Sequence, residues 1–223
     1  METKKLKARG LITTGRYGNT QALTMIFSAF NASGIPLENR GGVFYGQNMQ
    51  LMLEKALADE IDLVVTADWD SIFSVKQVNA IIENAVNDDS IDALAALQSR
   101  RGMANPLFSI DTSAVTGETF EVKFEGKPLQ VKTAHFGLTV IKVAKLKDVQ
   151  KPWFFAQPGE SGSWDDNRID DDIWFWKQWE KAGNSVYIDS SISIGHMEEF
   201  VTCYDETGSH QVMYPSDYRS LMT

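Results

Sequence analysis

The 223-residue sequence predicts an α/β fold, in which helices flank a mixed, mostly parallel sheet and the second half adds a small antiparallel section. Short apolar runs alternate with longer amphipathic segments over the first hundred residues, which is typical of β–α–β units with right-handed crossovers. The second half instead has two strand-like segments on either side of Gly126, which predicts antiparallel pairing. Hydrophobic residues make up 43% and charged residues 23%, so one packed core is expected.

The first half is expected to contain four strands and three helices. The strands are short and mostly apolar, and they span 11–14, 42–45, 63–66 and 92–96. Asn19 begins the first helix as an N-cap, and Ser74 begins the third through a capping box with Gln77. The second helix spans 47–58, where apolar residues recur at helical spacing. The apolar face of the first helix consists of Leu23, Ile26, Phe27 and Phe30.

The second half is expected to contain strands at 119–124 and 130–141, a loop at 152–164, a helix at 170–182 and a strand at 185–188. The loop is rich in Trp, Phe, Gly and Pro. No repeat or low-complexity tract divides the chain, so a single domain is expected over residues 1–207, followed by an irregular C-terminal tail at 208–223.

Charge and composition limit the expected partners and location. The net charge of −9 argues against broad electrostatic binding to nucleic acid or to an anionic membrane surface. The single cysteine, Cys203, excludes an internal disulfide and fits a reducing compartment. No apolar run approaches the ~20 residues that span a bilayer, and the N-terminal segment lacks the apolar stretch of a signal peptide. The expected location is the cytoplasm, or the host cytoplasm if the protein is viral.

Two carboxylates, Asp68 and Asp70, follow the most strand-like apolar run, with Trp69 between them. Ligands of parallel sheets bind beyond the carboxyl ends of the strands, so this segment and the one after Thr14 are expected at a site. Paired carboxylates can hold Mg²⁺ or Mn²⁺, and such an ion can bridge a diphosphate. Asp is common in this sequence, so an ordinary loop stays the alternative interpretation.

Three consecutive carboxylates, Asp170, Asp171 and Asp172, begin the helix expected at 170–182. The structural interpretation makes Asp170 the N-cap and places the other two in the first turn, where the helix dipole favours them. The functional interpretation is a general base, because a carboxylate at a helix N-terminus stays ionised at neutral pH. The residues alone leave both interpretations open.

Residues 192–196 alternate as a strand does and end in Gly195 and His196. Neutral imidazole is a good ligand for Mn²⁺, and the preceding glycine lets the backbone approach closely. A lone histidine is more often a structural residue, and this is the role expected for His135 and His210.

In this order, the motifs resemble those of the GT-A glycosyltransferases, especially the family 2-like members common in bacteria and their viruses. The resemblance covers about residues 10–202. Asp68-Trp69-Asp70 looks like the family's Asp-x-Asp motif, Asp171-Asp172 like its Glu-Asp, and Gly195-His196 like its late Gly-His. Weaker resemblances cover the opening strand end, the start of the second helix and a glycine-containing strand before the acceptor region.

The resemblance implies a GT-A fold and a metal-dependent transfer of sugar from a nucleoside-diphosphate sugar, such as a UDP-sugar, to an acceptor hydroxyl with inversion. Asp70 and His196 would bind Mn²⁺ or Mg²⁺, with Asp68 beside them. Asp172 would be the catalytic base, and Asp171 would be the other acid of the pair. The donor would contact Thr13, Thr14, Arg16, Tyr17, Asn48, Asp68, Trp69 and Gly137. Residues 1–100 would form the nucleotide-sugar half and residues 101–207 the acceptor half.

The acceptor stays open between a glycan, a small molecule and a hydroxylated base in DNA. A catalytically inactive binding protein is the other alternative, favoured by Gln47 where the family has Arg and by Asp171 where it has Glu. Arg100 and Arg101 are expected either to reach phosphate or acceptor or to be solvated. The aromatic loop at 152–164, with Trp153, Phe154, Phe155 and Trp164, is expected to form an acceptor wall or a lid, with Phe154 in the core.

Overall fold

A computed structural model describes residues 6–15, 18–101, 106–109, 126–165, 167–205 and 207–221. In this part of the chain, a seven-stranded sheet has the order β2-β1-β3-β7-β5-β8-β6. Its strands are β1 (Ala8–Thr14), β2 (Leu37–Gly41), β3 (Leu63–Asp68), β5 (Ala93–Leu97), β6 (Leu129–Val131), β7 (Leu138–Lys142) and β8 (Val186–Ser193).

The sheet is mixed and mostly parallel, as the sequence predicts. β1 is parallel to β2 and β3, and β5 is parallel to β8. β7 is antiparallel to both β3 and β5, and β6 is antiparallel to β8. All the strands except β6 and β7 therefore share one direction, and their carboxyl ends meet at one edge of the sheet.

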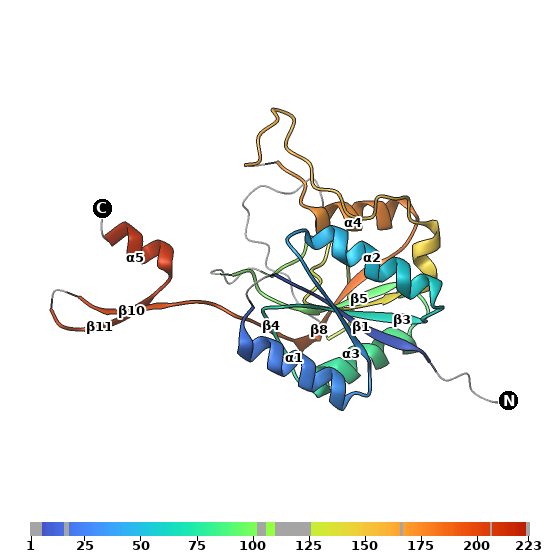
Figure 1. Cartoon of the computed structure of the whole chain (residues 1–223), viewed down its shortest axis with the longest axis horizontal. Coiled ribbons are helices and arrows are strands. Elements are labelled where there is room, and N and C mark those ends of the chain that lie inside the picture. Colours follow the sequence, from blue (N-terminus) through green and yellow to red (C-terminus); the bar gives the residue numbers. More distant parts are fainter. Residues whose placement is uncertain are drawn as a thin grey trace.

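Helices cover both faces of the sheet (Figure 1). α1 (Thr20–Ala32) and α3 (Val75–Asn87) lie on one face, and α2 (Tyr45–Ala58), α4 (Asp171–Lys181) and the 3₁₀ helix η1 (Val143–Asp148) lie on the other. Successive side chains of a strand point to opposite faces of the sheet, so each strand contributes to both core clusters. In β1, for example, Leu11 packs in the α2–α4 layer and Ile12 in the α1–α3 layer. The Asn19 side chain caps α1, and Ser74 with Gln77 forms the predicted capping box of α3.

Three local predictions are wrong. Residues 42–45 are not a strand, because β2 lies at Leu37–Gly41 and Tyr45 already begins α2. Phe27 is exposed rather than part of the buried face of α1. The predicted strand at 130–141 is broken, since β6 ends at Val131 and β7 begins at Leu138. The predicted strand at 119–124 lies outside the described residues.

The segment after β8 leaves the sheet, as Figure 1 shows. It contains an antiparallel hairpin of β10 (Val201–Tyr204) and β11 (His210–Met213), followed by α5 (Pro215–Leu221). The expectation of an irregular tail is therefore wrong for β11 and α5, and the domain boundary at residue 207 stays a prediction. Within the described ranges, no helix is both long and apolar enough to cross a lipid bilayer.

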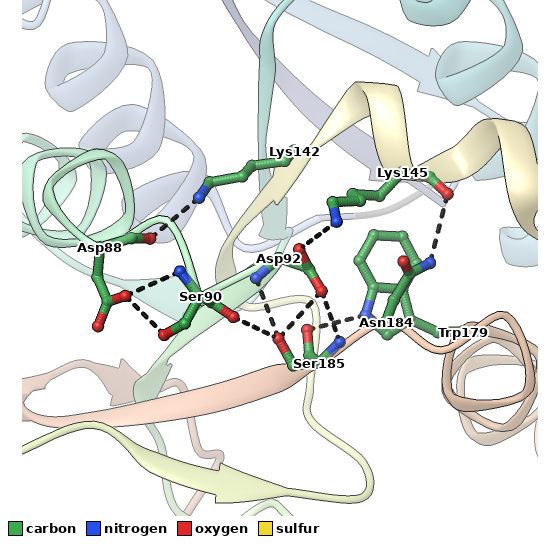
Figure 2. A network of polar contacts seen from close by, with 8 residues as sticks. All are labelled: Asp88, Ser90, Asp92, Lys142, Lys145, Trp179, Asn184 and Ser185. Atoms are coloured by element: carbon green, nitrogen blue, oxygen red, sulfur yellow. Dashed lines mark hydrogen bonds and ion pairs between the residues drawn. The ribbon is translucent and has the colours of Figure 1, made fainter.

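A polar network fastens the edge of the sheet at which β5 and β8 begin (Figure 2). The Asp92 carboxylate accepts hydrogen bonds from the Ser185 backbone N–H at 2.9 Å and from its hydroxyl at 3.1 Å. Lys145 of η1 forms an ion pair with the same carboxylate at 2.9 Å. These contacts join two strands and the layer above them at the edge opposite the strands' carboxyl ends.

Candidate functional site

Two distant segments meet where β3 ends. Asp68 is the last residue of β3, and the chain then turns through Trp69 and Asp70 into the short strand β4 (Ser71–Ile72). β4 pairs antiparallel with β9 (Gly195–His196), so that Ser71 lies opposite His196. The Met197 N–H donates to the Asp70 carbonyl at 2.8 Å, which fixes this register.

Asp70 and His196 are in contact, as the sequence hypothesis requires. His196 Nε2 lies 3.3 Å from Asp70 Oδ2, and His196 Nδ1 lies 3.0 Å from the Ser99 carbonyl oxygen. A carbonyl only accepts, so Nδ1 carries a proton and Nε2 is the ring atom that faces the carboxylate. The hydrogen bond to Asp70 raises the pKa of His196, although burial opposes the rise. Burial would raise the pKa of Asp70, but His196 and Arg101 together lower it below its ordinary value.

Buried polar contacts hold in place the two short strands that contain or adjoin Asp70 and His196. Gln98 Nε2 donates to Ser71 Oγ at 3.1 Å and to the Gly195 carbonyl at 3.3 Å, and so it holds β4 and β9 together. Gly137 is buried beside them, and a Cβ there would lie 2.4 Å from Gln98 Oε1 and 2.7 Å from Ser71 Oγ. The structure thus gives Gly137 a packing role, and its contact with a donor stays a prediction.

His135 is structural, in agreement with its expected role. It is buried, its Nδ1 accepts from the Gly137 N–H at 2.9 Å, and its Nε2 lies 2.7 Å from the Ala96 carbonyl. Burial lowers the pKa of His135 to about 4, so the ring is neutral at physiological pH.

Asp171 and Asp172 lie at the start of α4 and face different partners. Asp171 Oδ2 accepts a hydrogen bond from the Gly46 N–H at 2.9 Å, which caps the N-terminus of α2, a helix whose own N-cap residue makes no side-chain cap. Asp172 accepts from the Ile173 N–H at 2.7 Å. Burial raises the pKa of Asp172 to about 6, with smaller increases from Asp171 and Asp170. Asp172 is therefore the better candidate for a base, and Asp171 joins two helices.

The carboxylates of this edge influence one another. Burial raises the pKa of Asp68 to about 7, and Asp70 and Asp172 add to the increase. The Tyr45 hydroxyl is buried with no hydrogen-bond partner in the described structure, and Asp68, Asp172 and Asp171 add to the effect of burial in raising its pKa. Tyr45 is not among the site residues predicted from sequence, because residues 42–45 were predicted to form a strand. The available signal was the position of Tyr45 next to Gly46, at the start of the second helix.

Three of the remaining predicted donor-contacting residues, Thr13, Thr14 and Asn48, lie near the ends of β1 and β2. Thr13 is buried and pairs in register with Asp68, and the Thr14 hydroxyl donates to Asn39 Oδ1 at 3.1 Å. Asn48 lies close to this turn, since a Cβ on Gly42 would be 2.7 Å from its Nδ2. Trp69 is half-buried against the core. Arg16 and Tyr17 lie outside the described residues.

The aromatic loop divides into buried and exposed parts. Trp153 and Phe154 belong to the core. This agrees with the prediction for Phe154. Trp153 is too deeply buried to form part of an acceptor wall at the surface, so that prediction is wrong for Trp153. Phe155 and Trp164 are exposed. Phe155 packs edge-to-face on Trp174 with 5.6 Å between ring centroids.

A cavity of about 270 Å³ lies away from Asp70 and His196. It is formed by the second half of α4 with β6 and β8, and its lining includes Trp176, Trp179 and Lys132. Both tryptophans are fully buried, and Lys132 pairs with Glu180 across the lining. No residue predicted from sequence as a site residue lines it.

The residues present fit a divalent cation held partly by substrate. No three His, Cys, Asp or Glu side chains in the described ranges lie close enough together to form a complete metal cage. Mg²⁺ is usually held by one or two carboxylates together with substrate phosphates and water, and Mn²⁺ also accepts imidazole nitrogen. The Asp70 carboxylate and His196 Nε2 are such a pair.

The fold and the site place this chain among α/β proteins whose polar residues gather at the carboxyl edge of the sheet. No protein-family profile and no curated protein matches the sequence. Among solved structures, A197 from STIV is similar over 92% of this chain and 94% of that chain, with a TM-score of 0.58 and 15% identity. A putative glucose-1-phosphate thymidylyltransferase from Bacillus anthracis in complex with a sucrose matches over 82% and 86%, with a TM-score of 0.45 and 15% identity. The likeness to A197 supports the fold and assigns no activity.

Proposed function

We propose that this protein is a metal-dependent glycosyltransferase that moves a sugar from a nucleoside-diphosphate sugar to an acceptor hydroxyl, with inversion. The observation that carries the proposal is the contact between Asp70 and His196, at 3.3 Å, beside the carboxylates of Asp68 and Asp172. An oxygen ligand, a nitrogen ligand and a separate basic carboxylate are the groups that such a transfer needs. All of them gather where sheets of this kind bind ligands.

Asp70 and His196 would hold Mn²⁺ or Mg²⁺ on the donor diphosphate. The Ser99 carbonyl keeps the proton of His196 on Nδ1, so deprotonation leaves the lone pair of Nε2 directed toward the Asp70 side. A bound cation would supply Lewis-acid neutralisation of the departing nucleoside diphosphate. The remaining coordination positions would go to phosphate oxygens and water.

Asp172 would take the proton from the acceptor hydroxyl. With a pKa of about 6, its carboxyl is mostly ionised at neutral pH and still more basic than an ordinary Asp. Asp171 would keep Asp172 in position, because its contact with Gly46 ties the start of α4 to α2. Attack from the face opposite the leaving group then gives inversion at the sugar carbon.

Release of nucleoside diphosphate tests the proposal. The protein is incubated with a panel of UDP-, GDP- and dTDP-sugars and Mn²⁺, and free nucleoside diphosphate is measured together with calorimetric binding of the same nucleotides. Asp172→Asn should retain nucleotide binding and lose roughly 100-fold or more of the turnover, as expected for a general base. His196→Ala should lose Mn²⁺-dependent binding.

Matched controls separate these effects from loss of fold. Asp170→Asn removes the neighbouring carboxylate without removing a capping hydrogen bond, because the Asp170 side chain makes none, so its turnover should be close to that of the parent. His210→Ala removes an exposed histidine of the β10–β11 hairpin and should leave nucleotide binding unchanged. Binding without turnover for every donor would support a binding protein instead, and equal turnover of Asp172→Asn and Asp170→Asn would exclude Asp172 as the base.

A further inference from the structure

Arg101 already neutralises the carboxylate that the proposed cation would use. Its Nη2 lies 3.2 Å from Asp70 Oδ2, the same oxygen that His196 Nε2 approaches at 3.3 Å. The Asp70 side chain is only 6% exposed, whereas that of Arg101 is 60% exposed. One almost buried oxygen therefore has two nitrogen partners, and the guanidinium of Arg101 belongs to a side chain that is free to move into solvent.

A divalent cation and Arg101 compete for this position. Mg²⁺ binds carboxylate oxygen at about 2.1 Å, so a cation on Oδ2 would lie directly against a guanidinium that is 3.2 Å from that oxygen. Two positive groups at such a distance repel each other strongly at a partly buried site. A cation on Oδ2 would therefore displace Arg101 from Asp70.

Displaced Arg101 would remain close to the donor diphosphate. It follows β5 by four residues, in the same segment as Ser99, whose carbonyl holds the His196 ring. The guanidinium fork matches two phosphate oxygens, and charge-assisted hydrogen bonds of this kind are among the stronger ones in proteins. The diphosphate that arrives with the cation offers the displaced guanidinium a new anionic partner.

We propose that Arg101 is an exchange residue, which pairs with Asp70 in the free protein and transfers to the donor diphosphate when the cation binds. This inference rests on the proposed function, because it takes Asp70 as a metal ligand. It makes binding of cation and diphosphate cooperative. A cation that binds alone must break the Arg101–Asp70 ion pair and leaves Arg101 without an anionic partner. When diphosphate binds as well, Asp70 is paired with the cation and Arg101 with the diphosphate.

The test compares the parent protein with Arg101→Gln and with Arg100→Gln, an equal change of charge at the exposed neighbouring arginine. Mn²⁺ binding without nucleotide is measured by electron paramagnetic resonance of the free ion. Inorganic pyrophosphate binding at fixed Mn²⁺ is measured by calorimetry, which makes the result independent of base and sugar. Arg101→Gln should bind Mn²⁺ about two- to fivefold more tightly than the parent, as expected for loss of a partly exposed ion pair. It should bind pyrophosphate roughly tenfold more weakly.

A general loss of positive charge would also strengthen Mn²⁺ binding and weaken pyrophosphate binding, but it would act in the same way for Arg100→Gln. The difference between Arg101→Gln and Arg100→Gln therefore distinguishes exchange from a charge effect. Equal Mn²⁺ affinities of Arg101→Gln and Arg100→Gln, or equal pyrophosphate affinities, overturn the inference while the proposed metal site stands. If none of the three proteins binds Mn²⁺ in either experiment, both the metal site and the exchange are wrong.

Discussion

At the scale of single residues, burial sets the chemistry of the candidate base. Asp172 lies in the first turn of α4, and loss of solvation is the main reason for its raised pKa of about 6. Its position suits proton transfer because the carboxyl is both ionised and basic near neutral pH. The same loss of solvation destabilises the folded protein whenever Asp172 is charged. The burial that makes Asp172 a better base therefore also lowers the stability of the folded protein.

This conflict predicts that Asp172→Asn stabilises the protein at neutral pH. The folded pKa of about 6 exceeds the ordinary Asp value, so the folded state binds more protons between about pH 4 and pH 6, and stability falls as pH rises through this range. Above pH 6 the full penalty applies, and its removal should raise the free energy of unfolding by about 1–3 kcal/mol. Denaturant unfolding at pH 7.5 and at pH 4 measures this. A gain that is equal at the two pH values would contradict the explanation.

At the scale of elements, the contact between α2 and α4 positions the candidate base. Asp171 caps α2 through the Gly46 N–H, and Gly46 leaves no room for a side chain. A Cβ on Gly46 would lie 2.6 Å from Asp171 Oδ2 and 2.6 Å from Phe154 Cβ. Glycine is thus required by close approach, despite its low helix propensity.

Gly46→Ala should therefore destabilise the protein by about 1–3 kcal/mol, because the cost of overpacking exceeds the gain in helix propensity. The movement of α4 should also lower turnover more than nucleotide binding. Gln47→Ala, at the exposed neighbouring position of α2, should change stability by less than about 0.5 kcal/mol. Urea unfolding of both variants is the measurement, and a Gly46→Ala protein as stable as the parent would show that this helix contact tolerates separation.

At the scale of the whole molecule, the two edges of the sheet have different tasks. The carboxyl edge gathers acidic groups that are only partly neutralised, which is costly but suits a ligand site. The opposite edge contains the network of Asp92, Ser185 and Lys145, in which each polar group is satisfied by another (Figure 2).

Asp92→Asn should reveal how much this network contributes to the free energy of unfolding. Burial alone would raise the pKa of Asp92, but the hydrogen bonds from Ser185 and the charge of Lys145 lower it. A lowered folded pKa means a stabilising contribution that is present above the ordinary Asp pKa of about 3.9 and is lost as pH falls through the folded pKa. The substitution should cost about 1–3 kcal/mol at pH 7 and progressively less below pH 4. Asp89→Asn, at an exposed position nearby, is the control in thermal unfolding, and equal losses would assign the effect to net charge.

The predictions from sequence succeed where the signal is local. The caps at Asn19 and Ser74, the strand that leads to Asp68 and the helix from Asp171 all depend on neighbours within a few residues. The prediction for residues 42–45 is wrong because apolar character was taken as a strand signal, whereas the polar segment Leu37–Gly41 pairs with β1 at the sheet edge.

By itself, the sequence determined the α/β class, the order of the main elements and the presence of carboxylates after β3 and before α4, because periodicity and capping act between residues near in the chain. Only the tertiary structure decided two long-range contacts. His196 contacts Asp70, 126 positions away in the sequence, and Asp171 accepts a hydrogen bond from Gly46, 125 positions away. Those contacts depend on strand register and helix packing, which minimise the free energy of the whole chain rather than of any segment.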